Sequence, residues 1–116
     1  MSKIRYSPSA RADILAIMEY ISSDLDSPQA ARKTVNRIRR NILTLERFPR
    51  SGAPLDDYVS VKTDYRKLVC GNYLAFYRVE PGYVNIVRVL YGGRNWAKIL
   101  FGDMAEWTEN TDILKD

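Results

Sequence analysis

The sequence YRKLVCGNYLAFYRVEPGYVNIVRVLYGGRNW, residues 65–96, decides the fold. It contains three segments rich in apolar and β-branched residues, at 65–70, 73–79 and 83–91, and each predicts a β-strand. Gly71-Asn72 fits a two-residue hairpin turn between the first two strands, and a Pro-Gly pair typical of a type II turn joins the last two. The segment therefore predicts a three-stranded antiparallel meander.

Two serine–proline pairs upstream of the meander predict two helix starts. Ser7-Pro8 and Ser27-Pro28 each place a hydroxyl at the N-cap and a proline at the first helical position. Apolar residues then recur at helical spacing, and the second helix should end before Pro49. Because only a short connection near Asp26 separates the two helices, we expect an antiparallel helical hairpin.

The remaining segments complete an α+β pattern. Residues 3–6 predict a short strand, 49–64 a loop, and a last short helix should begin after Asn95 and end at Gly102. The order β-α-α-β-β-β-α predicts a two-layer fold, with the helical hairpin packed on a mainly antiparallel sheet whose other face is at least partly open. We expect residues 1–102 to form a single domain, followed by an acidic C-terminal tail at 103–116.

Composition excludes several kinds of chemistry. The 116 residues contain no histidine, which removes histidine-based catalytic triads and histidine metal sites. The single cysteine, Cys70, excludes an internal disulfide and a cysteine-rich zinc site. No apolar run is long enough to span a membrane, and the N-terminus has no signal-peptide pattern. We therefore expect a cytoplasmic protein without a metal, a small-molecule cofactor or a membrane partner.

Charge is distributed unevenly along the chain. The net charge is +4, but residues 101–116 hold five acids against Lys115. A basic body with an acidic tail suggests an acidic or polyanionic partner, although a merely soluble basic surface would have the same composition. The second predicted helix and its C-terminal extension are the most basic region, and their solvent face could bind phosphates or simply be hydrated. The cations there are Arg32, Lys33, Arg37, Arg39, Arg40, Arg47 and Arg50, against one acid, Glu46.

The meander carries a second group of cations, which are candidates for binding an anion. Guanidinium groups bind phosphate or carboxylate through two parallel hydrogen bonds, but such side chains can also be surface charges with buried aliphatic stems. Arg88 lies in an apolar strand, so it needs either a partner or an open groove. The group consists of Arg66, Lys67, Arg78, Arg88 and Arg94.

Gly92-Gly93-Arg94 connects the last strand to the last helix. The two glycines match neither a P-loop nor a dinucleotide-binding fingerprint, and we expect them to permit positive φ angles at a turn. Arg94 at the following helix N-terminus could bind an anion, or could pair with an acid of the tail such as Asp103 or Glu106.

The chain resembles a known family. The segments SARADILAIMEYI and SPQAARKTVNRI, and above all FYRV followed by VNIVRVLYGGRN, are similar to the RelE/ParE superfamily of toxins from bacterial type II toxin–antitoxin modules, closer to its ParE-like branch. The resemblance covers about residues 3–100. It implies a growth-inhibiting toxin whose partner is an acidic antitoxin protein with a disordered segment that folds onto the toxin.

The superfamily has two main activities. Its RelE-like branch cleaves mRNA on the ribosome, and its ParE-like branch poisons DNA gyrase. Arg94 and Lys67 fall on catalytic positions of the ribonuclease branch, but Leu74 replaces a second catalytic arginine and Leu100 replaces the C-terminal tyrosine. These departures favour gyrase as the target and leave open whether the protein is an enzyme.

Two alternatives to gyrase poisoning remain at this point. One is a ribosome-dependent mRNA endoribonuclease, and the other is an inactive remnant that only binds antitoxin. Arg94 and Lys67 would be catalytic only in a ribonuclease. The residues expected to bind an anion or the target are Arg66, Arg78, Arg88 and Tyr91.

Overall fold

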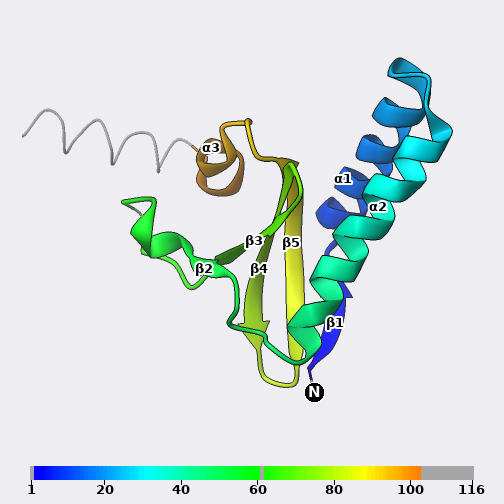
Figure 1. Ribbon diagram of the computed structural model, residues 1–116. Helices are drawn as coiled ribbons and strands as arrows, with labels where there is room; N and C mark the ends of the chain where they lie inside the picture. The colour runs from blue at the N-terminus through cyan, green and yellow to red at the C-terminus, as the bar shows by residue number, and fades with distance from the viewer. Residues whose placement is uncertain (1, 61, 103–116) are drawn as a thin grey trace, which may run out of the picture.

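The computed structural model describes residues 2–60 and 62–102 and contains a five-stranded sheet flanked by helices (Figure 1). The strands run in the order β1-β5-β4-β3-β2, with β1 parallel to β5 and the other pairs antiparallel. This arrangement confirms the predicted α+β class. The elements are β1 (Lys3–Tyr6), α1 (Pro8–Glu19), α2 (Pro28–Leu43), β2 (Ala53–Pro54), β3 (Arg66–Cys70), β4 (Tyr73–Glu80), β5 (Tyr83–Tyr91) and α3 (Trp96–Phe101).

One element differs from the sequence expectation: the segment predicted as a loop contains the two-residue strand β2, where Ala53 pairs with Lys67 of β3. The first helix reaches the predicted connection near Asp26 as expected, and its last part, Tyr20–Asp24, is a π-helical turn. The predicted acidic tail, 103–116, lies outside the described residues.

Both serine caps form as predicted. The hydroxyl of Ser7 accepts a hydrogen bond from the backbone N–H of Ala10 at 3.0 Å, and that of Ser27 accepts one from Ala30 at 3.3 Å. Ser7 also donates from its hydroxyl to the carbonyl of Val87 at 2.7 Å, which ties the start of α1 to the edge of β5.

The sheet has one large and one small apolar layer. The helical hairpin covers one face with side chains such as Ile14, Val35 and Ile38, which pack against Tyr77 and Ile86 of the sheet. On the opposite side of the sheet lie α3 and the segment after β2 (Figure 1). They cover a smaller cluster of Leu55, Leu74, Phe76 and Leu90. This second face stays partly open, because Val69 is 63% exposed.

A bulge in β5 explains its irregular sequence pattern. Phe76 pairs with Arg88 but Tyr77 pairs with Ile86, so Val87 is an extra residue on β5. The bulge reverses the alternation, so Ile86 and Val89 both face the hairpin, whereas Leu90 faces α3. Within the described ranges, none of the helices is both long and apolar enough to cross a membrane.

Candidate functional site

Arg94 lines a cavity that borders the helical hairpin. The cavity has a volume of about 620 Å³ and lies between α1, the π-helical turn and the ends of β4 and β5. Three tyrosines, Tyr20, Tyr73 and Tyr91, give it an aromatic wall, and the rings of Tyr73 and Tyr91 pack edge to face at 6.0 Å. Burial, together with the neighbouring hydroxyls of Tyr20 and Tyr91, raises the pKa of Tyr73. The other lining residues are Asp13, Ala16, Ile17, Leu25, Val89 and Leu90.

The glycines before Arg94 lie where a side chain would be crowded, and their backbone angles are not in the positive-φ region. The prediction that they adopt positive φ is wrong, since the glycines that do so are Gly71, Gly82 and Gly102. A Cβ on Gly93 would lie 2.6 Å from the ring of Tyr91, and one on Gly92 would lie 3.3 Å from the carbonyl oxygen of Asn72. Gly93 therefore leaves room for the Tyr91 ring at the rim of the cavity.

Arg88 has a partner within the protein. Its Nε and terminal nitrogen donate to the two carboxylate oxygens of Asp13 at 2.7 and 2.8 Å. Asp13 also accepts from the backbone N–H of Val89 at 2.9 Å, at a point on the edge of β5 that β1 does not reach. The hydrogen bonds to Asp13 raise the pKa of Arg88. This pair fixes α1 to the sheet and supplies the partner that the position of Arg88 requires.

Lys67 lies on the other face of the sheet, among aromatic rings. Its Nζ is 3.8 Å from the ring centroid of Tyr58 and 5.5 Å from that of Trp96. Trp96 in turn packs on Phe76, with the ring centroids 5.3 Å apart. Leu74 and Leu100, the two departures from the ribonuclease pattern, both belong to the apolar cluster beneath α3.

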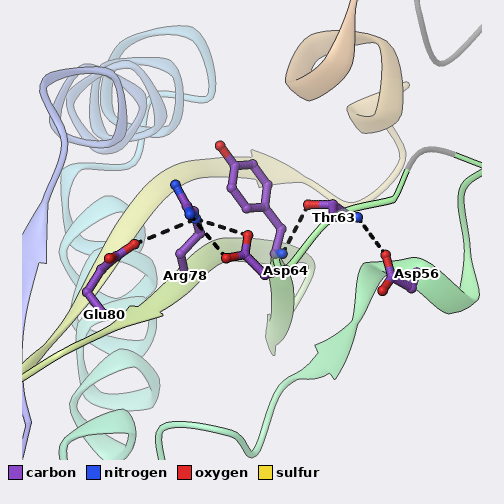
Figure 2. A network of polar contacts seen from close by, with 6 residues as sticks. Asp56, Thr63, Asp64, Arg78 and Glu80 are labelled. Carbon is purple, nitrogen blue, oxygen red and sulfur yellow. Dashed lines mark hydrogen bonds and ion pairs between the residues drawn. The ribbon is translucent and has the colours of Figure 1, made fainter.

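Arg66 and Arg78 lie near the β2 edge of the sheet. Figure 2 shows Arg78 between the carboxylates of Asp64 and Glu80. Its guanidinium group donates two hydrogen bonds to Asp64, at 3.0 and 3.1 Å, and lies 3.6 Å from the carboxylate of Glu80. The hydrogen bond to Asp64 is the main reason that the pKa of Arg78 is raised. Arg66 donates to the backbone carbonyls of Arg50 and Gly52 at 3.1 and 2.8 Å.

The six candidate residues therefore do not form one site. Arg94 and Tyr91 share the 620 Å³ cavity, and neither Lys67 nor Arg66 lines it. The guanidinium groups of Arg66, Arg78 and Arg88 donate hydrogen bonds to acceptors within this chain. In the part of the chain that the structure describes, no three acidic or cysteine side chains gather as a metal ion would require.

A second cavity, of about 470 Å³, lies in the groove between α1 and α2. It is mostly apolar, with Leu15 60% and Leu43 53% exposed, and it has arginines at its rim. We call it the hairpin groove. It is lined by Tyr6, Arg11, Ile14, Leu15, Met18, Arg39 and Leu43.

Sequence reasoning missed Asp13, Tyr58 and the hairpin groove. The signal for Asp13 was indirect: Arg88 needed an acid, and Asp13 is an acid next to the apolar residue Ile14 of α1. Tyr58 has no local signal, because its contact with Lys67 depends on how the segment after β2 folds back over the sheet.

Comparison with protein families settles the relationship. Residues 4–96 match the model of the ParE toxin of the type II toxin–antitoxin system parDE. The chain belongs to the ParE toxin family. The match includes the meander, the helical hairpin and the Gly92-Gly93-Arg94 corner of this ParE toxin.

Three solved structures are similar to this chain, and the first of them supports the fold. The ParE toxin is similar to a chain of the chromosomal ParDE toxin–antitoxin system from P. aeruginosa, with 23% identity and a TM-score of 0.65 over 78% of this chain and 96% of that chain. A chain of the RelBE2 toxin–antitoxin complex from Mycobacterium tuberculosis has 20% identity and a TM-score of 0.47, with the same coverage of 78% and 96%. YafQ from E. coli has 17% identity and a TM-score of 0.44 over 88% of this chain and all of YafQ. No curated protein matches this sequence significantly.

Proposed function

We propose that this ParE toxin acts in the cytoplasm by poisoning DNA gyrase and that an acidic antitoxin protein holds it inactive. The observation that carries the choice of gyrase is the separation of the residues that a ribonuclease would need. Lys67 packs on Tyr58 and Trp96 on one face of the sheet, whereas Arg94 lines a cavity beside the hairpin.

The chemistry of RNA cleavage supports the same choice. Cleavage needs a base at the 2′-hydroxyl and cations at the phosphate, all within hydrogen-bonding reach of one substrate. Leu74 is buried in the apolar cluster beneath α3, and Leu100 packs against that cluster. Both side chains are therefore part of the packing between α3 and the sheet. Tyr73 is a poor substitute base, because its raised pKa favours the neutral phenol.

One observation favours the ribonuclease alternative. Arg94 and Tyr91 lie at the same cavity, and Tyr91 is 53% exposed, so a phosphate could contact both. An mRNA endoribonuclease built on Arg94 is therefore the second candidate function. The third candidate, an inactive remnant, differs from both by the absence of toxicity.

The hairpin groove suits the proposed antitoxin. An amphipathic segment could bury apolar side chains against Leu15 and Leu43 while its acids meet Arg11 and Arg39 at the rim. Apolar anchors would supply most of the affinity, and the basic body would accelerate encounter, so the association rate should fall steeply as salt is added.

Induced expression separates the three candidates. Without antitoxin, the toxin should stop bacterial growth and induce the DNA-damage response, while total mRNA stays intact. Rapid loss of mRNA that Arg94→Ala abolishes would support the ribonuclease instead. Normal growth with soluble, folded protein would support the remnant.

A further inference from the structure

The outward side of α2 carries four exposed cations, of which Arg37 also lies against the turn at Gly71. Arg32, Lys33, Arg37 and Arg40 are exposed, whereas core-facing residues of the same helix, such as Ile38, are fully buried. None of the ion pairs found among residues 2–60 and 62–102 involves these four side chains. We call them the α2 basic face.

Helix stability does not account for the α2 basic face. Acids in the first turn interact favourably with the positive end of the helix dipole, yet the first turn of α2 has none. Lys33 and Arg37 are four residues apart, a spacing at which like charges destabilise a helix. Arg40 lies in the last turn, where a cation is favourable, but this accounts for one of the four side chains. Helix stability therefore does not explain why the cations are concentrated on this side of α2.

The make-up of this face selects the class of partner. The exposed side chains between Arg32 and Arg40 are cations and the amide Asn36, with no aromatic or aliphatic residue among them. Proteins that hold single-stranded nucleic acids add aromatic side chains that stack on bases, and membrane-surface helices need an apolar face. Protein interfaces centre on well-packed, desolvated anchors in which arginine is accompanied by Trp or Tyr, and the α2 basic face has arginines without an aromatic residue. A row of exposed cations without aromatic or aliphatic neighbours suits the regularly spaced phosphates of a nucleic-acid duplex.

We infer that the α2 basic face binds the sugar–phosphate backbone of duplex DNA without reading its sequence. With a rise of 1.5 Å per residue, Arg32 and Arg40 are about 12 Å apart along the helix axis, close to the width of the DNA major groove. The choice of DNA over an RNA duplex rests on the proposed function, because gyrase works on duplex DNA. Arg11, Arg39 and Leu43 line the hairpin groove, so the α2 basic face adjoins the surface proposed for the antitoxin but shares no residue with it.

Fluorescence anisotropy with a short, labelled DNA duplex of mixed sequence tests the inference on the purified full chain. The double variant Lys33→Gln/Arg40→Gln should bind about tenfold more weakly or worse, and its plot of log affinity against log salt should be shallower by about 2. The control Lys3→Gln/Lys62→Gln removes the same net charge at exposed positions away from α2 and should change affinity by less than about threefold. Unchanged melting temperatures would establish that both variants fold.

Three results would overturn the inference. They are the absence of duplex binding even at about 50 mM salt, equal losses in the two double variants, and tighter binding to an RNA duplex of the same sequence than to the DNA. The assay contains no gyrase, so its failure would leave the proposed target standing. Conversely, duplex binding would survive if gyrase proved not to be the target.

Discussion

Two arginine–aspartate pairs with the same two-pronged geometry should differ in energy because they differ in burial. The Asp13 side chain is 11% exposed where it meets Arg88, whereas Asp64 is 66% exposed where it meets Arg78. Asp13→Ala also leaves the backbone N–H of Val89 without its acceptor. We expect Asp13→Ala to lower the free energy of unfolding by about 2–3 kcal/mol and Asp64→Ala by less than about 1 kcal/mol.

Urea denaturation of the two variants measures this difference. Equal losses of unfolding free energy would show that neither the burial of Asp13 nor its hydrogen bond from Val89 adds to stability. Asp13→Asn should fall between wild type and Asp13→Ala, since the amide oxygen can still accept from Val89 while the charge is lost.

Cys70 should be unreactive in the folded protein. Burial raises the pKa of its thiol from the usual 9.0 to about 11, so little thiolate forms near neutral pH. The unfolded thiol ionises first as the pH rises, so the contribution of Cys70 to stability is complete below about pH 9 and is lost as the pH rises through about 11.

Alkylation with iodoacetamide and denaturation across this pH range measure both effects. Reaction at pH 8 should be slow until urea unfolds the chain, and Cys70→Ala should show a smaller loss of stability between about pH 9 and 11. Rapid alkylation of the folded protein would contradict the burial of the thiol.

At the scale of elements, the two helix starts have the same sequence signature and should not have the same energy. Ser7 and Ser27 both cap a helix that begins with proline, but only Ser7 also donates to the sheet, at the carbonyl of Val87. Ser27→Ala should cost about 1 kcal/mol and Ser7→Ala about 2 kcal/mol, because the second change also leaves a partly buried acceptor without its donor. Thermal melts of both variants check the order, which would be wrong if Ser27→Ala proved the costlier change.

Local signals were enough to predict most elements. The signals for helix ends and turns involve only residues that are close together in sequence. They are the two Ser–Pro pairs, the turn at Gly71-Asn72 and the helix caps at Asn95 and Gly102, and each forms where it was predicted. The strand β2 has no such signal, because two residues become a strand only through their pairing with β3. The bulge at Val87 also depends on the partner strand, so the alternation of β5 could not be assigned to faces from sequence.

The candidate site was less predictable than the fold, for a related reason. Sequence identifies Arg88 as a charge that needs a partner, but Asp13 lies 75 residues away and meets it only after the hairpin docks. Lys67 reaches Tyr58 and Trp96 only because α3 and the segment after β2 fold over the same face. Such contacts depend on tertiary packing, which no local pattern encodes.

For the molecule as a whole, the proposed partners bind to different surfaces. The hairpin groove between α1 and α2 is apolar with a basic rim, and α2 presents exposed cations outward. The cavity at Arg94 lies where α1 meets the ends of β4 and β5. The ribonuclease positions do not converge on any of them. We therefore propose that toxicity comes from binding to gyrase and not from cleaving RNA.

Incubation of the purified toxin with gyrase, supercoiled plasmid and ATP tests this proposal. We predict that linear, gyrase-linked DNA accumulates with increasing toxin, and that the toxin leaves mRNA intact on ribosomes programmed in a parallel reaction. Unchanged gyrase activity together with ribosome-dependent mRNA cleavage, lost in Arg94→Ala, would contradict the account and make Arg94 a catalytic residue.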